Sequence, residues 1–207
     1  MRKNREIKII FILLAVFFLA FLALPMIMVL ARSFTADGTA GITFSNYVEV
    51  LTEKGFLQAL GNSLLISVCS ALVTTVLAFI LAYTIHYTNV GRRYKKLVEK
   101  AAVLPMLLPT ITYGFAIIYS FGNEGLLTKL FGRKLFDIYG FNGLLLGYVI
   151  YTLPISFMLI HNAMGYIDKR FMIVSRLMGD SPLQTFRMTI LTPLLGTLAA
   201  SFIQTFF

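Results

Sequence analysis

The sequence predicts an all-α membrane protein, built as a polytopic bundle of transmembrane helices. Hydrophobic residues make up 58% of the 207 residues and charged residues only 13%, which is about half the charged share of soluble domains. The apolar residues also gather in separate stretches of roughly 20 residues, the length that a helix needs to cross about 30 Å of hydrocarbon. Helices are expected because an open strand edge in lipid would leave backbone groups unpaired.

Five apolar segments are expected to form the helices of a single transmembrane domain over residues 1–207. They cover residues 9–30, 64–87, 101–121, 143–164 and 190–207. The first follows a basic N-terminus, as in a signal peptide. It is longer than a signal h-region of about 7 to 15 residues, however, and no small-residue cleavage site follows it. We therefore interpret it as a retained first helix.

The fifth segment is short. Only fourteen residues follow Pro193, fewer than a spanning helix needs. The sequence therefore predicts that the fifth helix is truncated at Phe207 and that at least one further helix is missing from this sequence.

Lys and Arg are distributed unevenly among the connecting segments. Alternate segments, starting with the N-terminus, carry thirteen of them, and the remaining segments carry five. The positive-inside rule then places the N-terminus, the loop around Arg92 and the segment around Arg176 in the cytoplasm. This topology accounts for the net charge of +9, so no nucleic-acid partner is expected.

The two outer segments are expected to hold short elements. Residues 32–62 include an amphipathic stretch, residues 47–60, that we expect near the membrane interface. Residues 122–142 are expected to form a short surface helix between turns.

Ionisable residues are absent from the interior of the predicted spans. No Asp, Glu, Lys or Arg lies within the four complete apolar segments, which counts against a proton- or ion-coupled carrier, because such carriers place ionisable groups there. His86 and His161 lie near the cytoplasmic ends of their helices, and we assign neither a chemical role. Hydroxyl residues recur in the second segment, where they suit close packing or a polar pathway. These are Ser63, Ser67, Ser70, Thr74 and Thr75.

The sequence also lacks the motifs of nucleotide binding and of common enzyme sites. The dipeptide Gly-Lys does not occur, so the chain has no Walker A loop, and no His-Glu-x-x-His or Gly-x-Ser-x-Gly motif is present. Cys69 is the only cysteine, which excludes an intrachain disulfide and a cysteine-based metal site. We expect no enzymatic activity and no cofactor in this chain. If transport consumes ATP, another subunit must bind it.

The predicted cytoplasmic segment of residues 166–190 has the pattern of a helical elbow. Residues 171–178 are helical in pattern, and Gly179 is a natural stop because it can take a positive φ. Ser181 can cap the next helix, with Pro182 at its first position and Gln184 completing a capping box. The elbow also carries many apolar side chains, which suit either the lipid interface or a groove in a partner protein. They are Phe171, Met172, Leu177, Met178, Leu183 and Phe186.

This elbow resembles the cytoplasmic loop of permease subunits from binding-protein-dependent ABC importers. That loop has a Glu-Ala-Ala, three residues, Gly pattern, and a Leu-Pro marks the next helix. Here residues 173–175 occupy the Glu-Ala-Ala position, Gly179 matches the glycine, and residues 179–187 match the usual continuation. Two departures are that Ile173 replaces the acidic residue and that Pro193 lies one residue later than the family proline.

Weaker matches to the same family occur in order along nearly the whole chain. They are Asn46-Tyr47, Gly61-Asn62-Ser63-Leu64, Ala82-Tyr83, Leu104-Pro105, Pro109 and Leu153-Pro154. The divergent loop resembles most the branch that handles ferric iron, polyamines, thiamine or 2-aminoethylphosphonate, in which two permease units can be fused in one chain. The phosphonate type is our hypothesis within that branch.

The resemblance implies the fold of an ABC importer permease in a bacterial-type plasma (inner) membrane. It implies a coupling helix that docks into a cytoplasmic ABC ATPase dimer and moves the membrane helices between inward- and outward-facing states. The contact residues that it implies are Ser175, Arg176, Gly179, Asp180, Ser181 and Pro182. Further implied partners are an extracytoplasmic solute-binding protein and a second permease unit, identical, different or fused. The alternatives are a non-transporting structural membrane protein and an ion-coupled secondary carrier.

Overall fold

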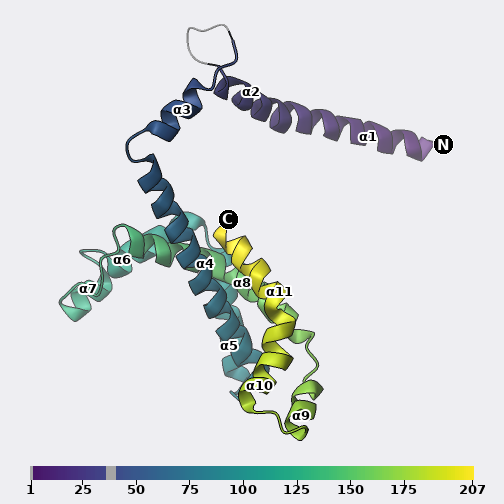
Figure 1. The fold of residues 1–207 in the computed structure, drawn as a ribbon, viewed down its shortest axis with the longest axis vertical. Helices are drawn as coiled ribbons and strands as arrows, with labels where there is room; N and C mark the ends of the chain where they lie inside the picture. The colour runs from purple at the N-terminus through teal and green to yellow at the C-terminus, as the bar shows by residue number, and fades with distance from the viewer. Residues whose placement is uncertain (1, 36–40) are drawn as a thin grey trace. The chain divides into compact units, whose positions relative to one another are not determined.

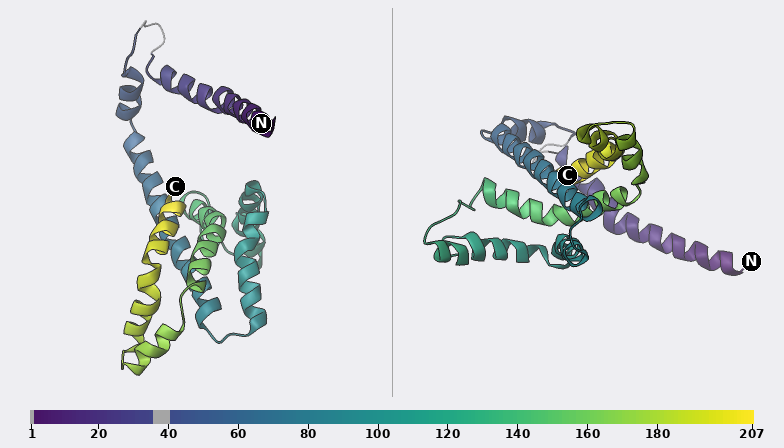
Figure 2. Two further views of the ribbon diagram at one scale, coloured as in Figure 1. Left: turned by 90° about the vertical axis from the view of Figure 1, so that its right-hand side faces the viewer. Right: turned by 90° about the horizontal axis from the view of Figure 1, so that it is seen from below.

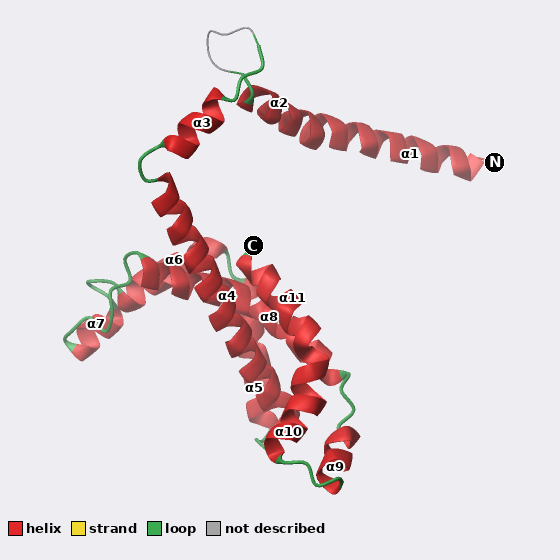
Figure 3. Ribbon diagram, viewed as in Figure 1, coloured by secondary structure: helices red, strands yellow, loops and turns green. Residues whose placement is uncertain are grey.

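The computed structural model describes residues 2–35 and 41–207, and within these ranges it contains helices and turns but no strand (Figures 1 and 3). The chain divides into two compact units, Met1–Gly61 and Asn62–Phe207. Four helices of the described residues are long and apolar enough to cross a membrane, or five if one bent pair counts as a single span. The chain is thus a multi-pass membrane protein.

The first unit holds one long apolar helix followed by a short one. The long helix comprises α1 (Arg2–Phe18), a π-helical turn (Leu19–Ala23) and α2 (Leu24–Ser33), so it extends beyond the predicted residues 9–30 at both ends. The short helix is α3 (Ser45–Thr52).

Side chains at the start of α3 join it to the end of α2. The Tyr47 hydroxyl lies 2.6 Å from the Ser33 hydroxyl, and the Asn46 amide donates to the carbonyls of Ser33 and Thr35 at 3.3 and 3.0 Å. The Asn46-Tyr47 pair therefore fixes the turn between two helices. Its position in the sequence alone did not indicate this role.

The second unit is built around three long helices that lie alongside one another (Figures 1 and 2). They are α4 (Phe56–Tyr87), which begins in the first unit, α8 (Phe141–Gly165) and α11 (Thr192–Phe206). Two polar contacts join α4 to α8, one between the hydroxyls of Thr74 and Thr152 at 3.0 Å and one between the rings of His86 and His161 at 3.2 Å. The α4 helix begins eight residues before the predicted Leu64, directly after Gly55 at φ +107°.

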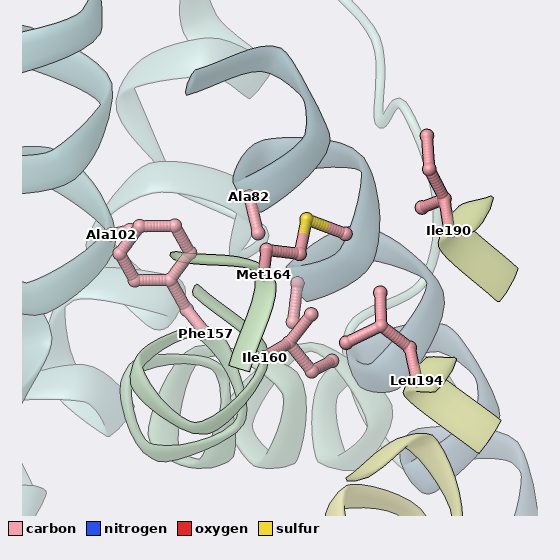
Figure 4. Packing of buried hydrophobic residues seen from close by; sticks show 8 residues of the cluster. Ala82, Ala102, Phe157, Ile160, Met164, Ile190 and Leu194 are labelled. Atoms are coloured by element: carbon pink, nitrogen blue, oxygen red, sulfur yellow. The ribbon is translucent and has the colours of Figure 1, made fainter. Parts of the chain in front are cut away.

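Small residues allow these helices to pack closely in the core of this unit. Ala78 and Ala82 of α4 are fully buried, and Phe157 of α8 is 1% exposed. Small side chains leave space for the large side chains of facing helices, which then gain van der Waals contact. Figure 4 shows part of this cluster, whose buried members are Ala78, Ala82, Ala102, Phe157, Ile160, Met164, Ile190 and Leu194.

The third predicted helix, residues 101–121, is not continuous in the structure. It is divided into α5 (Arg92–Val103) with a 3-10 turn (Leu104–Leu107), and α6 (Thr110–Phe121). The direction changes by 111° at this break. The cause is local, because Pro109 lacks an N–H donor and forces Leu108 out of the helical region, to ψ 143°. The Tyr113 hydroxyl donates to the carbonyls of Pro105 and Leu108 at the break.

The connection from α6 to α8 contains the short helix expected between residues 122 and 142. This helix, α7 (Leu126–Phe131), is one and a half turns long and ends at Gly132, which has φ +65°. A left-handed residue directly after the last turn is a common helix stop that favours glycine. The expectation of a short helix between turns is therefore confirmed.

Overpacking tests the importance of the small residues in α4. Ala82→Leu should lower the free energy of unfolding by about 1–3 kcal/mol, because the added methyl groups have no space in the core. The measurement is thermal unfolding of the detergent-solubilised chain. Val76→Leu is the matched control, since Val76 lies on the same helix but is 55% exposed. An equal effect of both substitutions would contradict this packing.

Candidate functional site

Residues 166–190, the elbow segment, lie between the long helices α8 and α11. The segment consists of α9 (Arg170–Leu177), α10 (Pro182–Phe186) and the start of a π-helical turn (Arg187–Leu191). The Asp168 carboxylate accepts a hydrogen bond at 2.9 Å from the backbone N–H of Arg170, at the start of α9. The helix predicted for residues 190–207 follows α10 and the π-helical turn without a break. The apolar span therefore begins at Pro182 instead of residue 190.

Gly179 ends the first helix of the elbow segment, as its sequence predicts. Its φ is +86°, a conformation that side-chain-bearing residues rarely adopt. The backbone N–H groups of Gly179 and Asp180 donate to the carbonyls of Arg176 and Ser175, both at 3.1 Å. No atom lies within 4 Å of the position that a Cβ would take. Glycine is therefore required here by backbone conformation and not by lack of space.

Ser181 caps the second helix of the elbow segment. Its hydroxyl accepts a hydrogen bond at 3.3 Å from the backbone N–H of Gln184, and the Gln184 side chain accepts one at 3.2 Å from the backbone N–H of Ser181. Pro182 occupies the first turn, where a missing N–H has no cost. The capping box expected from the sequence is confirmed, so the turn between α9 and α10 has one defined geometry.

Ser175 and Asp180 brace the two helices from the inside of the turn. The Ser175 hydroxyl donates to the Asp180 carboxylate at 2.6 Å and lies 3.0 Å from the Thr185 hydroxyl. Ser175 is 7% exposed and Thr185 is also buried. Among the six residues that the family resemblance implies, Ser175 and Asp180 therefore shape the elbow, whereas Arg176, Gly179, Ser181 and Pro182 lie on its surface.

The tip of the elbow segment exposes large apolar side chains. Leu177, Met178 and Leu183 are 82%, 79% and 76% exposed. The sequence singles them out as apolar residues, but the family-based contact set does not include them. Three adjacent apolar side chains on a rigid turn form a surface of the kind that docks into a groove of another protein.

The elbow segment is attached to α4 at both of its ends. At the start, the Lys169 ammonium donates to the backbone carbonyl of His86 at 2.8 Å and lies 5.7 Å from the centre of the Tyr87 ring. At the end, the Phe186 ring packs edge-on against Phe79 and Tyr83, with ring centres 6.1 and 5.9 Å apart. A displacement of the elbow segment must therefore move the end of α4 or break these contacts.

His86 and His161 strengthen the same region by joining α4 to α8. Besides the 3.2 Å contact between ring nitrogens, the His161 ring stacks on Phe157, with ring centres 5.2 Å apart. Sequence reasoning gave neither histidine a chemical role and did not predict that the two would meet. The two residues are 75 positions apart, and no local pattern connects them.

The late position of Pro193 is accounted for by the π-helical turn that precedes it. In Arg187–Leu191 the backbone bonds close around one residue more than in an α-helix. The Arg187 carbonyl at the start of this turn also accepts a hydrogen bond at 2.8 Å from the hydroxyl of Thr192, the residue before Pro193. The extra residue is thus absorbed in one wide turn, and the helix continues into α11 without a break.

The hydroxyl residues of α4 serve packing in one place and line a cavity in another. Thr74 is fully buried and its hydroxyl is hydrogen-bonded to that of Thr152, so it contributes to the packing of α4 against α8. One helical turn earlier, a cavity of about 370 Å³ lies between α4, α8 and α11. Its polar lining residues are Ser67, Ser70, Tyr148, Tyr151, Thr152, Gln204 and Thr205.

Removal of the Ser175 hydroxyl tests the internal brace. Ser175→Ala should speed amide hydrogen exchange across residues 175–185 about tenfold, because the lost hydrogen bonds each contribute roughly 1 kcal/mol to the closed state. Arg170→Ala is the matched control, since the Arg170 side chain is exposed on the same helix and its removal should leave exchange unchanged. Equal exchange in all three proteins would show that the brace does not hold the turn.

No protein-family model matches the chain, but individual proteins do. A Haemophilus influenzae protein named as a ferric transport system permease is 28% identical over 202 residues, which cover 94% of this chain and 31% of that protein. The ferric transport system permease protein of Actinobacillus pleuropneumoniae is 29% identical over 202 residues, 94% of this chain and 28% of that protein. The chain therefore spans less than a third of the length of these two relatives.

Among solved structures, the chain is similar to a bacterial ABC transporter that imports the acidic polysaccharide alginate. The TM-score is 0.75 at 19% identity, with 99% of this chain and 75% of that chain covered. The same transporter in complex with a periplasmic protein bound to an alginate pentasaccharide gives a TM-score of 0.74 at 18% identity, with 99% and 72% covered. In sequence the chain is thus a relative of transport-system permease proteins, and it has the fold of an ABC importer permease.

Proposed function

We propose that the chain is the membrane-spanning permease subunit of an ATP-driven importer, and that its elbow segment receives the force of a separate ATPase. The observation that carries this proposal is the elbow itself. It has a rigid turn, an exposed apolar tip and attachments to α4 at both ends. A loop that only connected two membrane helices would need none of these features.

In this mechanism the ATPase binds the tip formed by Leu177, Met178 and Leu183. The hydrogen bond between Ser175 and Asp180 keeps α9 and α10 in a fixed relative position. A force on the tip therefore moves the whole elbow segment instead of deforming the turn. The displacement then passes to α4 through Lys169 and Phe186. Transmission through packed, rigid elements is the physical basis of such rigid-body transitions.

The proposed partners follow from what the chain has and lacks. Without a Walker A loop it needs a cytoplasmic ABC ATPase dimer, and the placement of Lys and Arg puts the N-terminus and the elbow segment on the cytoplasmic side. The alginate transporter forms a complex with a periplasmic binding protein, which supports an extracytoplasmic solute-binding protein here. A second permease unit, identical, different or fused, would complete the pathway in the inner membrane.

The relatives' names give a range of possible substrates. Two of them are assigned to ferric transport, and a Mycoplasma pneumoniae relative at 24% identity over 201 residues is a homologue of a spermidine/putrescine permease. Further relatives are named for sulfate and for molybdate/tungstate transport. The ferric and polyamine names support the ferric and polyamine branch. The narrower hypothesis of 2-aminoethylphosphonate stays a prediction from the sequence.

Two substitutions in the elbow segment test force transfer. Leu183→Asp should reduce ATP-dependent solute uptake in membrane vesicles at least about tenfold, because a carboxylate cannot be buried in an apolar groove without a cost of several kcal/mol. Gly179→Leu should do the same, since leucine is strained at φ +86°. The amount of protein in the membrane should not change for either variant.

Leu130→Asp is the matched control for Leu183→Asp. Leu130 lies on α7 and is also 76% exposed, but it belongs to the segment predicted to face outward. Uptake by this variant should stay within about twofold of the unmodified protein. Normal uptake by Leu183→Asp and Gly179→Leu would remove the elbow segment from the transport mechanism.

A further inference from the structure

A basic cavity of about 380 Å³ lies where the end of α4, the α4–α5 connection and α9 meet. Polar and cationic side chains of all three regions line it. The ones that matter here are His86, Thr88, Asn89, Lys95, Lys169 and Arg176. None of the lining residues is acidic. The cavity therefore has donors in excess and a positive charge of three from its lysines and arginine.

The three cations of this cavity come from separate parts of the chain. Lys95 belongs to the first turn of α5, Lys169 precedes α9, and Arg176 lies in its last turn. Among the side chains that the structure describes, one ion pair is found, between Lys129 and Glu124 at 3.3 Å, and neither residue lines this cavity. Bringing like charges together without a counter-charge is unfavourable. An anion bound among these three cations would offset their mutual repulsion.

The donor geometry suits an anion with several oxygen atoms. Lys169 is held in place by the His86 carbonyl and the Tyr87 ring, which fixes one charge at the edge of the cavity. Arg176 offers a planar guanidinium fork that matches phosphate oxygens, and Lys95 offers a compact charge. The amide of Asn89 adds a neutral donor. A phosphate group carries several oxygen atoms that can accept hydrogen bonds from donors of these kinds.

The position of the cavity along α4 indicates where such a phosphate would come from. The helix is a candidate membrane span that ends at Tyr87, and three of the lining residues, Tyr87, Thr88 and Asn89, sit at or directly after that end. Tyrosines gather at the headgroup level of membranes, and Tyr83 and Tyr87 stack there one turn apart. Basic pockets between helices at this depth bind lipid headgroups.

We propose that this basic cavity binds a phosphate group, supplied by the headgroup of an anionic phospholipid. Lys169 and Arg176 belong to the elbow segment and Lys95 to α5, so the bound phosphate ties the elbow segment to the α4–α5 connection. The apolar tip at Leu177, Met178 and Leu183 is a different surface. The proposal therefore holds whether or not an ATPase binds that tip.

The test measures lipid binding to the purified full chain in a neutral detergent. Phosphatidylglycerol and phosphatidylcholine are titrated separately, and bound lipid is counted by native mass spectrometry. The unmodified protein should prefer phosphatidylglycerol. Lys95→Gln and Arg176→Gln should each weaken phosphatidylglycerol binding roughly fivefold, the effect expected for one cation near a membrane surface.

Lys96→Gln is the matched control for Lys95→Gln. It removes the same charge from the next position of the same helix, but Lys96 does not line the basic cavity. Its effect on phosphatidylglycerol binding should stay below about twofold. Equal losses for Lys95→Gln and Lys96→Gln would overturn the proposal, because they would show attraction to overall charge. The proposal would also be overturned if phosphatidylglycerol and phosphatidylcholine bound equally well and inorganic phosphate displaced neither.

A further arm separates the sources of the phosphate. Millimolar inorganic phosphate could displace phosphatidylglycerol from the unmodified protein but not from Lys95→Gln. That result would support the basic cavity as a phosphate site and would show that it also binds free phosphate. No displacement, with lipid preference intact, supports the lipid headgroup alone. A different result would overturn the proposal. Lys95→Gln and Arg176→Gln would then bind lipid and phosphate normally but no longer copurify with an ATPase. In that case the basic cavity would bind an acidic side chain of a partner protein.

Discussion

The attachment of the elbow segment to α4 is the constraint on which the proposed transport mechanism depends. Lys169 caps the carbonyl end of α4 through His86, and Phe186 packs against the aromatic face of Phe79 and Tyr83. The α4 helix contains no proline over its 32 residues, a length of about 48 Å. A stiff helix held at one end transmits displacement along its axis, whereas a kinked one would absorb part of it. His86 and His161 extend the same connection to α8.

The prolines of the other helices show three backbone arrangements around a proline in a membrane protein. Lipid offers no hydrogen bonds, so each group that a proline frees must find a partner within the protein. At Pro25 and Pro193, a π-helical turn directly before the proline keeps the helix continuous. At Pro109 the helix breaks, and the Tyr113 hydroxyl bonds to carbonyls at the break. Pro154 is buried inside the otherwise regular α8.

These differences explain why the extra residue before Pro193 does not disrupt the elbow segment. The wide turn at Arg187–Leu191 absorbs one residue, so α10 keeps its contacts with α4 and α11 keeps its contacts with α8. The departure from the family pattern is thus a local change in helix winding.

Local features of this chain could be predicted from its sequence, and long-range contacts could not. The apolar spans, the stop at Gly179 and the Ser181–Gln184 capping box depend on residues within a few positions of one another, where hydrophobicity and backbone preference decide the structure. The bond between His86 and His161, the Lys169 contact and the burial of Ser175 each require knowing which helices meet. The break at Pro109 lies between these cases, because a proline is a local signal for an interrupted helix but does not set the 111° angle between the two halves.

The side of the membrane on which the elbow segment lies tests the central claim most directly. In a Cys69→Ser background, Met178→Cys and Leu130→Cys each provide a single thiol at a highly exposed position on the elbow segment and on α7. A membrane-impermeant maleimide applied to intact cells should label the thiol at position 130 and should reach position 178 only after the membrane is opened. Labelling of position 178 in intact cells, with position 130 protected, would contradict the account, because no cytoplasmic ATPase could then push on the elbow segment.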